Sequence, residues 1–415
     1  GNTAMSADFL VEIGTEELPP KALLTLSNAF RDSILAQLKQ EQLGFESVET
    51  FAAPRRLAIT ITELQTETPA KEIVAWGPPI KVAFDDDGKP TKAAEAFAKK
   101  NGIAIDDLDS KVENDGKQDK LCHRATEPGK NTANLLGPIV ETSLSSLPIP
   151  KRMRWGASRE EFVRPVHWVV MLLGNDVIDT TVMGLKSGNK SQGHRFHHTG
   201  EVTITAPTNY QEALREAYVI ADFSERRELI RQGVTKAAEN AGGTAVIDGG
   251  LLDEVTALNE WPVPLLGRFE ERFLTVPAEA LVSSMAEHQK YFHVVDSNNK
   301  LLPMFITVAN IESTDPAQVI NGNERVIRPR LADAAFFYET DLKTTLEARR
   351  ESLKNIVFQA KLGSIFDKTE RVAKLATALA KATGADPVLA SRAAEISKSD
   401  LVSEMVGEFD DLQGT

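Results

Sequence analysis

The stretch FLVEIGTEELPPKAL at residues 9–23 changes from an apolar run through a turn to the start of a helix. Its first part, Phe9 to Ile13, predicts a short strand that breaks at Gly14. Pro19-Pro20 then introduce a helix, because the side chains that follow repeat along one helical face: Leu23, Ser27, Phe30, Ile34 and Leu38. Residues 56–64 alternate between apolar and small or polar side chains, which predicts a half-buried strand. The chain therefore begins as a mixed α and β structure.

The rest of the chain divides into regions of different character. Residues 67–149 contain polar turns, and we expect an inserted α/β subdomain with a small core of its own. Residues 150–325 return to mixed strands and helices and would complete the body that residues 5–66 begin. Residues 326–415 have helical patterns throughout, which predicts an all-helical domain. The expected fold class is therefore α+β with several domains.

Local signals refine this division. The body is expected to contain further strands at 162–173, 202–205, 291–295 and 304–309. Thr91 is placed to cap a helix that runs to Lys100, and Asp222 with Glu225 fits a capping box.

The composition is that of a globular protein, with 42% hydrophobic and 26% charged residues in a chain of 415. No apolar run is long enough to span a membrane, and the start does not have the pattern of a secretory signal. The single cysteine, Cys122, excludes an intramolecular disulfide framework, so we expect a cytoplasmic protein. The net charge of −13 disfavours indiscriminate nucleic-acid binding but leaves room for a local basic face.

Two groups of titratable residues raise the question of metal binding or catalysis. His194, His197 and His198 in GHRFHH have the spacing that places imidazoles on one helical face. They lack the glutamate of an HExxH motif, and flanking glycines favour a polar loop over a metal site. Glu16 and Glu17 form a carboxylate pair, for which complementing the dipole of the following helix is favoured over acid–base catalysis. We therefore expect no catalytic residue and no metal site.

Other signals of enzymatic chemistry are weak. The polar residues of SMAEHQKYFHV at 284–294 fit a solvated face as well as a functional cluster. The sequence contains no GxxxxGK[ST] phosphate loop, no strand-linked GxGxxG and no GxSxG elbow. The residues alone indicate a multidomain protein without an obvious active centre.

Basic residues gather in three places along the chain. One cluster surrounds Trp155, a second spans residues 186–195 and a third lies at 325–330. The members are Lys151, Arg152, Arg154, Arg159 and Arg164 in the first, Lys186, Lys190 and Arg195 in the second, and Arg325, Arg328 and Arg330 in the third. Such clusters suit a phosphate backbone, and a nearby aromatic ring suits an unstacked base. A solvated surface patch remains the alternative for each cluster taken alone.

Long blocks of the sequence resemble the glycyl-tRNA synthetase β subunit family. The blocks occur in order along nearly the whole chain: FLVEIGTEELPPKAL (9–23), FAAPRRLA (51–58), PIPKRMRWG (148–156), FVRPVHW (162–168), GHRF (193–196), EWPVPLLGRFEERFL (260–274), VPAEALVSSMAEHQKYF (276–292), VANIES (308–313), GNERVIRPRLADAAFF (322–337) and KLGSIFDKTERV (361–372). Because several blocks are long, the resemblance is specific.

The resemblance implies a noncatalytic, tRNA-binding subunit of glycine–tRNA ligase. In such an α2β2 enzyme the α subunit forms the adenylate with ATP and Mg²⁺, so this chain is expected to need no cofactor. The expected partners are the α subunit and tRNA(Gly), not DNA or a membrane. The candidate tRNA contacts are Lys151, Arg152, Arg154, His194, Arg195, Arg325, Arg328 and Arg330.

The resemblance also implies a B3/B4-like module in the body and an HD-like helical domain after it. The family's C-terminal anticodon-binding domain is missing, so we expect a fragment. A working HD centre needs histidine ligands, and the sequence has none after His293. This disfavours a metal-dependent phosphohydrolase or nuclease, which is the main alternative. A scaffold that only holds a partner subunit is the other.

Overall fold

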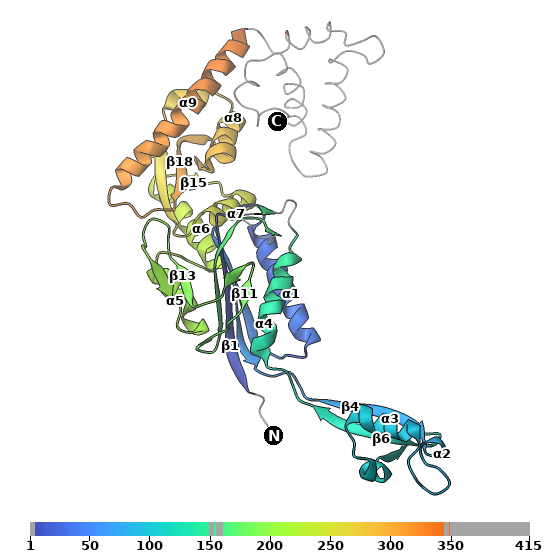
Figure 1. The fold of residues 1–415 in the computed structure, drawn as a ribbon. Coiled ribbons are helices and arrows are strands. Elements are labelled where there is room, and N and C mark those ends of the chain that lie inside the picture. Colours follow the sequence, from blue (N-terminus) through green and yellow to red (C-terminus); the bar gives the residue numbers. More distant parts are fainter. Residues whose placement is uncertain (1–4, 149–152, 155–160, 344–347, 349–415) are drawn as a thin grey trace.

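The computed structural model describes residues 5–148, 153–154, 161–343 and 348, which form a body, an arm and a second unit with its own sheet (Figure 1). The body contains an antiparallel sheet of five strands in the order β10-β9-β1-β3-β2. These strands are β1 (Ser6–Thr15), β2 (Ser47–Ala53), β3 (Arg56–Gln65), β9 (Val166–Leu173) and β10 (Asp176–Val177). The strand predicted at 9–13 is therefore the central strand of the body.

The sequence predicts that the first strand breaks at Gly14, but β1 continues through Gly14 to Thr15. Gly14 pairs with Arg56 on one side and with Trp168 on the other. A Cβ atom at Gly14 would lie 1.8 Å from Cε2 of Trp168, so a side chain there would collide with the indole. The glycine is needed for close packing across the sheet, not for ending the strand.

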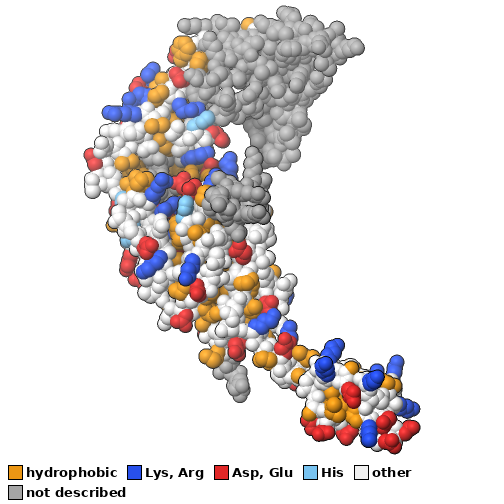
Figure 2. Space-filling view, viewed as in Figure 1, with side chains coloured by type: hydrophobic (Ala, Val, Ile, Leu, Met, Phe, Trp, Pro, Cys, Tyr) orange, Lys and Arg blue, Asp and Glu red, His pale blue; other side chains and the backbone are white. Residues whose placement is uncertain are grey.

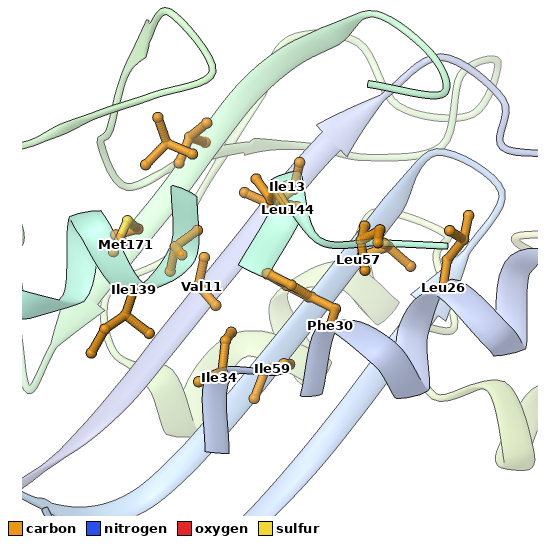
Figure 3. Close-up of a cluster of buried hydrophobic side chains, with 14 of the residues drawn as sticks. Val11, Ile13, Leu26, Phe30, Ile34, Leu57, Ile59, Ile139, Leu144 and Met171 are labelled. Atoms are coloured by element: carbon orange, nitrogen blue, oxygen red, sulfur yellow. The ribbon is translucent and has the colours of Figure 1, made fainter. Parts of the chain in front are cut away.

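One face of this sheet is covered by α1 (Leu23–Gln40) and α4 (Thr132–Ser145) (Figure 1). The helical face predicted in α1 is buried, and Figure 3 shows Leu26, Phe30 and Ile34 pointing toward the strands. Helix α4 lies within the predicted insertion 67–149, yet its Ile139 and Leu144 pack into the same core (Figure 3). The core of the body therefore combines α1, which precedes the predicted insertion, with α4, which lies near the C-terminal end of that insertion.

The other face of the sheet is covered by η2 (Pro207–Asn209), α5 (Tyr210–Glu216) and short strands. The short strands on this face are β13 (Lys190–Gln192) and β14 (Glu201–Thr203). The hairpin of β11 (Thr181–Val182) and β12 (Leu185–Lys186) packs instead into the core on the side of α4, and β7 (Met153–Arg154) pairs separately with β8 (Glu161–Phe162). Leu10 and Val170 pack here against Leu214. Because both faces are covered, the apolar run 9–13 has few polar positions.

The arm comprises residues 71–127 and projects from the body (Figure 1). Its elements are β4 (Lys71–Pro79), α2 (Ile80–Ala83), α3 (Lys92–Asn101), η1 (Ile105–Ser110), β5 (Val112–Asn114) and β6 (Asp119–Glu127). Phe97, Leu108 and Leu121 form part of a separate hydrophobic cluster. Thr91 lies at the start of α3 as predicted, but its hydroxyl donates to the carbonyl of Val82 (2.7 Å) and makes no side-chain cap.

The second unit contains the sheet β15-β17-β18-β16. Its elements are α6 (Phe223–Asn240), β15 (Thr244–Ala245), α7 (Gly249–Leu258), β16 (Val263–Arg268), η3 (Glu271–Thr275), α8 (Ala278–Ser283), the π-helical turn η4 (Ser284–His288), β17 (Phe292–Val295), β18 (Leu301–Ala309) and α9 (Pro316–Lys343). Asp222 caps α6 as predicted, because its Oδ1 accepts from the backbone N–H of Glu225 (3.1 Å).

The helix α9 begins at Pro316, earlier than the predicted start of the helical region at 326, and passes through Pro329. The rest of the helical region predicted at 326–415 lies outside the described residues, apart from Ala348. The mixed α and β fold class is confirmed, and the all-helical domain remains a prediction. No helix in the described part of the chain is both long and apolar enough to cross a membrane.

Candidate functional site

A carboxylate lies at the centre of the body. Glu12, in the middle of β1, has no solvent-exposed surface. Its Oε1 accepts hydrogen bonds from Nε1 of Trp168 (2.5 Å) and Oγ of Ser191 (2.5 Å). Its Oε2 accepts from Nη1 of Arg56 (3.3 Å) and from the hydroxyl of Tyr210. These donors satisfy a charge that would otherwise be strongly unfavourable in the interior.

Burial and the charge of Glu12 control the ionisation of its neighbours. Burial raises the pKa of Tyr210 well above its ordinary value, and Glu12 raises it further. Burial alone would lower the pKa of Arg56, but Glu12 and Glu260 offset that effect and raise the pKa above its ordinary value. Both shifts favour a charged Arg56 and a protonated Tyr210 at neutral pH, which are the forms that donate hydrogen bonds to Glu12.

Two other arginines connect this network to its surroundings. Arg55 donates from Nε to Glu260 (2.9 Å) and from Nη2 to the carbonyl of Gly193 (2.6 Å). Arg226, on α6, donates from Nη2 to the carbonyl of Ala52 in β2 (2.7 Å). Burial lowers the pKa of Arg226 to about 9. The second unit is therefore joined to the body through buried guanidinium groups.

Next to this network the surface has a cleft of about 850 Å³. Its walls are formed by Thr15, Glu16, Glu17, Arg55, Arg164, His167, Trp168, Gln192 and Arg195. Residues from four separate parts of the sequence thus meet at one cleft, and the lining carries both carboxylates and guanidinium groups. Such a surface can bind a ligand with acidic groups and with hydrogen-bond donors.

Glu16 and Glu17 line this cleft, whereas the sequence favoured a role at the start of the following helix. The first turn of α1 contains no acidic residue. Instead, Oε1 of Glu16 lies 3.2 Å from Nε2 of His167, and Oε1 of Glu17 lies 3.8 Å from Nη1 of Arg195. Both pairs are exposed, so each contributes only about 0–1 kcal/mol and can exchange its partner for a ligand.

The turn at residues 193–198 forms one rim of the cleft. His194 is fully buried, and its Nδ1 accepts from the backbone N–H groups of Phe196 (3.0 Å) and His197 (3.2 Å). This leaves the proton on Nε2, which donates to the carbonyl of Asn310 (2.6 Å). Both nitrogens of His194 are thus used to hold the turn. Among the described residues, no three His, Cys, Asp or Glu side chains lie together as a metal site requires.

The rings of His197, Tyr218 and Trp261 contact one another in a row, and Phe196 precedes His197 in the turn with its ring 6.0 Å from that of His194; we call these four residues, Phe196, His197, Tyr218 and Trp261, the aromatic ridge. Phe196 is 66% exposed, and the guanidinium of Arg195 lies 5.8 Å from its ring centroid. The ring of Tyr218 lies 5.0 Å from His197 and 5.3 Å from Trp261. Nε1 of Trp261 donates to Glu312 (3.1 Å). The ridge is therefore an ordered aromatic surface that begins at the rim of the cleft.

Tyr218 has an unusual backbone conformation. It follows α5 with a φ of 63°, in the left-handed region where helix ends usually have glycine. A tyrosine at such a position is unfavourable by about 1–2 kcal/mol. Its ring packs against His197 and Trp261 and remains 36% exposed. Contacts with the neighbouring rings offset the strain and keep the phenol group at the surface.

The structure separates the predicted basic clusters. Arg195 and Arg164 meet at the cleft, whereas Arg325 and Arg328 are exposed on α9 and do not line it. Arg330 is half-buried. Lys151 and Arg152 lie outside the described residues, and only the backbone of Arg154 is described, in β7. A shared role of the three clusters in binding RNA therefore stays a prediction.

Sequence reasoning missed several residues of this site. Arg55 lies beside the buried Arg56, and the motif APRR does not show which arginine faces the cleft. Tyr218 and Trp261 join the ridge only through the tertiary fold. A tyrosine where glycine usually ends a helix was the only signal available for Tyr218, and it is a weak one.

Comparison with known proteins gives the class and then the family. The sequence model described as glycyl-tRNA synthetase beta subunit matches residues 9–415. Relatives named glycine–tRNA ligase beta subunit occur in Marinobacter nauticus (61% identical) and Hahella chejuensis (56% identical), and each match covers 98% of this chain and 59% of the relative. A third, in Pseudomonas entomophila, is 55% identical over 99% of this chain and 59% of the relative.

These relatives are subunits of aminoacyl-tRNA synthetases. The chain belongs to the glycyl-tRNA synthetase beta subunit family, as its sequence blocks indicate. It spans about 59% of the length of the curated relatives above.

Proposed function

We propose that this chain is the noncatalytic, tRNA-binding part of the β subunit of glycine–tRNA ligase. With an α subunit, in an α2β2 assembly in the cytoplasm, it would support the ATP-dependent attachment of glycine to tRNA(Gly). The observation that carries this proposal is the family match across residues 9–415. The adenylate-forming site, with ATP and Mg²⁺, is assigned to the α subunit.

The charge distribution supports local rather than general contact with RNA. The chain has a net charge of −13, and Figure 2 shows basic and acidic side chains interspersed over much of the body. A phosphate backbone must therefore be held at particular basic sites. Arg195 at the cleft is one, because its exposed pair with Glu17 can open. Arg325 and Arg328 on α9 are a second.

The remaining candidates take different roles in this proposal. His194 is buried, so it would position Arg195 through the turn instead of touching RNA. Lys151, Arg152 and Arg154 remain candidate contacts. A B3/B4-like module in the body and an HD-like domain at 326–415 belong to the same proposal. DNA and membranes are not expected partners.

The direct test combines this chain with purified α subunit and tRNA(Gly). The chain alone should bind tRNA with an affinity that falls linearly with salt concentration on logarithmic axes. It should show no glycine-dependent pyrophosphate exchange, whereas α subunit should supply that activity. Exchange by the pure chain would overturn this division of roles.

The alternatives give different results in the same assay. A scaffold would bind the α subunit but not tRNA. A phosphohydrolase would turn over a phosphodiester in the presence of manganese, and that turnover would respond to changes of acidic residues in 326–415. Either outcome contradicts the proposed function.

A further inference from the structure

The aromatic ridge and the cleft form one surface with two kinds of chemistry. The turn at 193–198 belongs to both, since Arg195 lines the cleft and Phe196 begins the ridge. The cleft offers guanidinium groups for phosphates and the carboxylates of Glu16 and Glu17 for hydroxyl donors. The ridge offers the exposed ring of Phe196 and the 36% exposed ring of Tyr218, beside the half-buried rings of His197 and Trp261. Unpaired bases stack on such rings in a sequence-tolerant way.

The surface is ordered before any ligand binds. His194 fixes the backbone of Phe196 and His197 and is itself held by Asn310. The side-chain Oδ1 of Asn310 also accepts from the backbone N–H of Trp261 (3.0 Å). The turn and the far end of the ridge therefore share one anchor, the half-buried Asn310. A preformed surface loses less entropy when it binds a ligand than a mobile one does.

This combination fits single-stranded RNA better than a duplex. A base-paired stem presents phosphates to arginines, but its bases are stacked on one another and cannot use the ridge. Ribose hydroxyls can donate to carboxylates such as Glu16 and Glu17, and the 2′-hydroxyl distinguishes RNA from DNA. In a tRNA, the unpaired 3′ end provides free bases, phosphates and a terminal ribose with two hydroxyl groups.

We propose that the aromatic ridge binds the unpaired 3′-terminal nucleotides of tRNA, with Arg195 and the glutamates of the cleft holding their phosphates and ribose hydroxyls. This inference rests on the proposed tRNA-binding function and deepens it. It assigns to Phe196, Tyr218 and Trp261 a role that basic clusters alone do not indicate.

The test uses two tRNA(Gly) transcripts, one complete and one that ends at the paired acceptor stem, with the 415-residue chain. The wild-type chain should bind the complete tRNA about tenfold more tightly or better, because stacking of even one base supplies a difference of that size. A third transcript with deoxyribose at the 3′-terminal positions should bind with intermediate affinity.

Variants then locate the effect. Tyr218→Gly removes the ring and relieves the left-handed backbone, so the fold should remain stable while the preference for complete tRNA falls. Phe196→Ala removes a side chain that is 66% exposed and should act in the same direction. The matched control is Phe45→Ala, which removes an aromatic ring that is 38% exposed elsewhere on the body. Neither ridge variant should affect the shortened tRNA.

The outcomes separate the two proposals. If the wild-type chain binds both transcripts equally, the ridge assignment is overturned and tRNA binding stands. If Tyr218→Gly weakens both transcripts alike, the ring does not contact the 3′ end, and the assignment is also overturned. Loss of affinity for the α subunit with unchanged tRNA preference would make the ridge a subunit interface instead. Failure to bind any tRNA overturns the proposed function itself.

Discussion

The turn at residues 193–198 and the helix α9 both present arginines to solvent, but they hold them in different ways. Arg195 extends from a backbone fixed by His194, and an aromatic ring lies beside its guanidinium. Arg325 and Arg328 extend from an exposed helical surface, where Nε of Arg328 lies 3.9 Å from Glu270. At Arg325 and Arg328 the helix therefore offers charge, whereas the turn offers charge together with the ring of Phe196 beside the guanidinium. Only the second arrangement can distinguish a paired from an unpaired nucleotide.

The largest expected effect on stability comes from replacing Glu12, the centre of the buried network beside the cleft. Glu12→Ala removes the nearer carboxylate from the buried Arg56 and leaves it with Glu260, whose Oε1 lies 3.7 Å away; breaking a buried ion pair costs about 3–5 kcal/mol. Urea unfolding should report this loss. Glu49→Ala, at an exposed residue of β2 in the same sheet, is the control and should change stability little. Replacing both Glu12 and Arg56 by methionine should recover part of the loss. A Glu12→Ala protein as stable as the control would contradict the role given to the network.

A smaller effect is expected from Gly14→Ala. The new Cβ would lie 1.8 Å from Trp168, whose indole lines the cleft, so the ring must move. Overpacking of this kind costs about 1–3 kcal/mol. Gly188→Ala is the control, because a Cβ there meets nothing within 4 Å. Unfolding midpoints and indole fluorescence should both shift for Gly14→Ala and stay unchanged for Gly188→Ala. Equal shifts in the two variants would show that the contact between a Cβ at residue 14 and Trp168 does not cause the loss of stability.

The salt dependence of tRNA binding sharpens the comparison between the turn and α9. Arg325→Ala with Arg328→Ala should lower the salt slope by about two units and leave the preference for complete tRNA unchanged. Arg195→Ala should lower the slope by about one unit and also reduce that preference. Binding titrations at several salt concentrations measure both quantities. Identical behaviour of the two sets of variants would remove the distinction.

The smallest effect concerns pH. Burial lowers the pKa of His197, and the nearby His194 lowers it further. The unfolded chain therefore binds a proton at a higher pH than the folded chain, so stability falls as pH decreases through the ordinary histidine range. His197→Gln keeps an acceptor for the N–H of Glu312 without titrating. Its unfolding midpoint should depend less on pH between about pH 7 and about pH 5 than that of the wild type. A steeper pH dependence of the midpoint in the variant than in the wild type would contradict a lowered pKa of His197 in the folded chain.

Patterns set by neighbouring residues were predicted well. The apolar face of α1 and the Asp222 cap of α6 depend on spacings of a few residues, and both are present. The loop character of 193–198 followed from its glycines, and a Cβ at Gly193 would meet Ala217 at 2.6 Å. The family followed from long sequence blocks and is confirmed by the match over 9–415.

Features that depend on distant partners were not predictable in this way. Gly14 looks like a strand end until Trp168 is placed beside it. Glu16 and Glu17 precede a helix in the sequence, but the fold directs them toward His167 and Arg195. The ridge joins residues from three separate segments, and no short-range pattern brings Tyr218 to Trp261.

The base of the arm has a consequence for how this chain can change in evolution. The chain enters and leaves the arm at one point, where Thr68 donates its N–H to the carbonyl of Lys130 (2.9 Å) and Glu67 bridges to Asn131. Seen from the body, the whole arm occupies the place of a single tight turn. A longer or shorter arm would therefore not require any rerouting of β3 or α4, so we expect insertions and deletions in the arm to be tolerated better than in the sheet of the body.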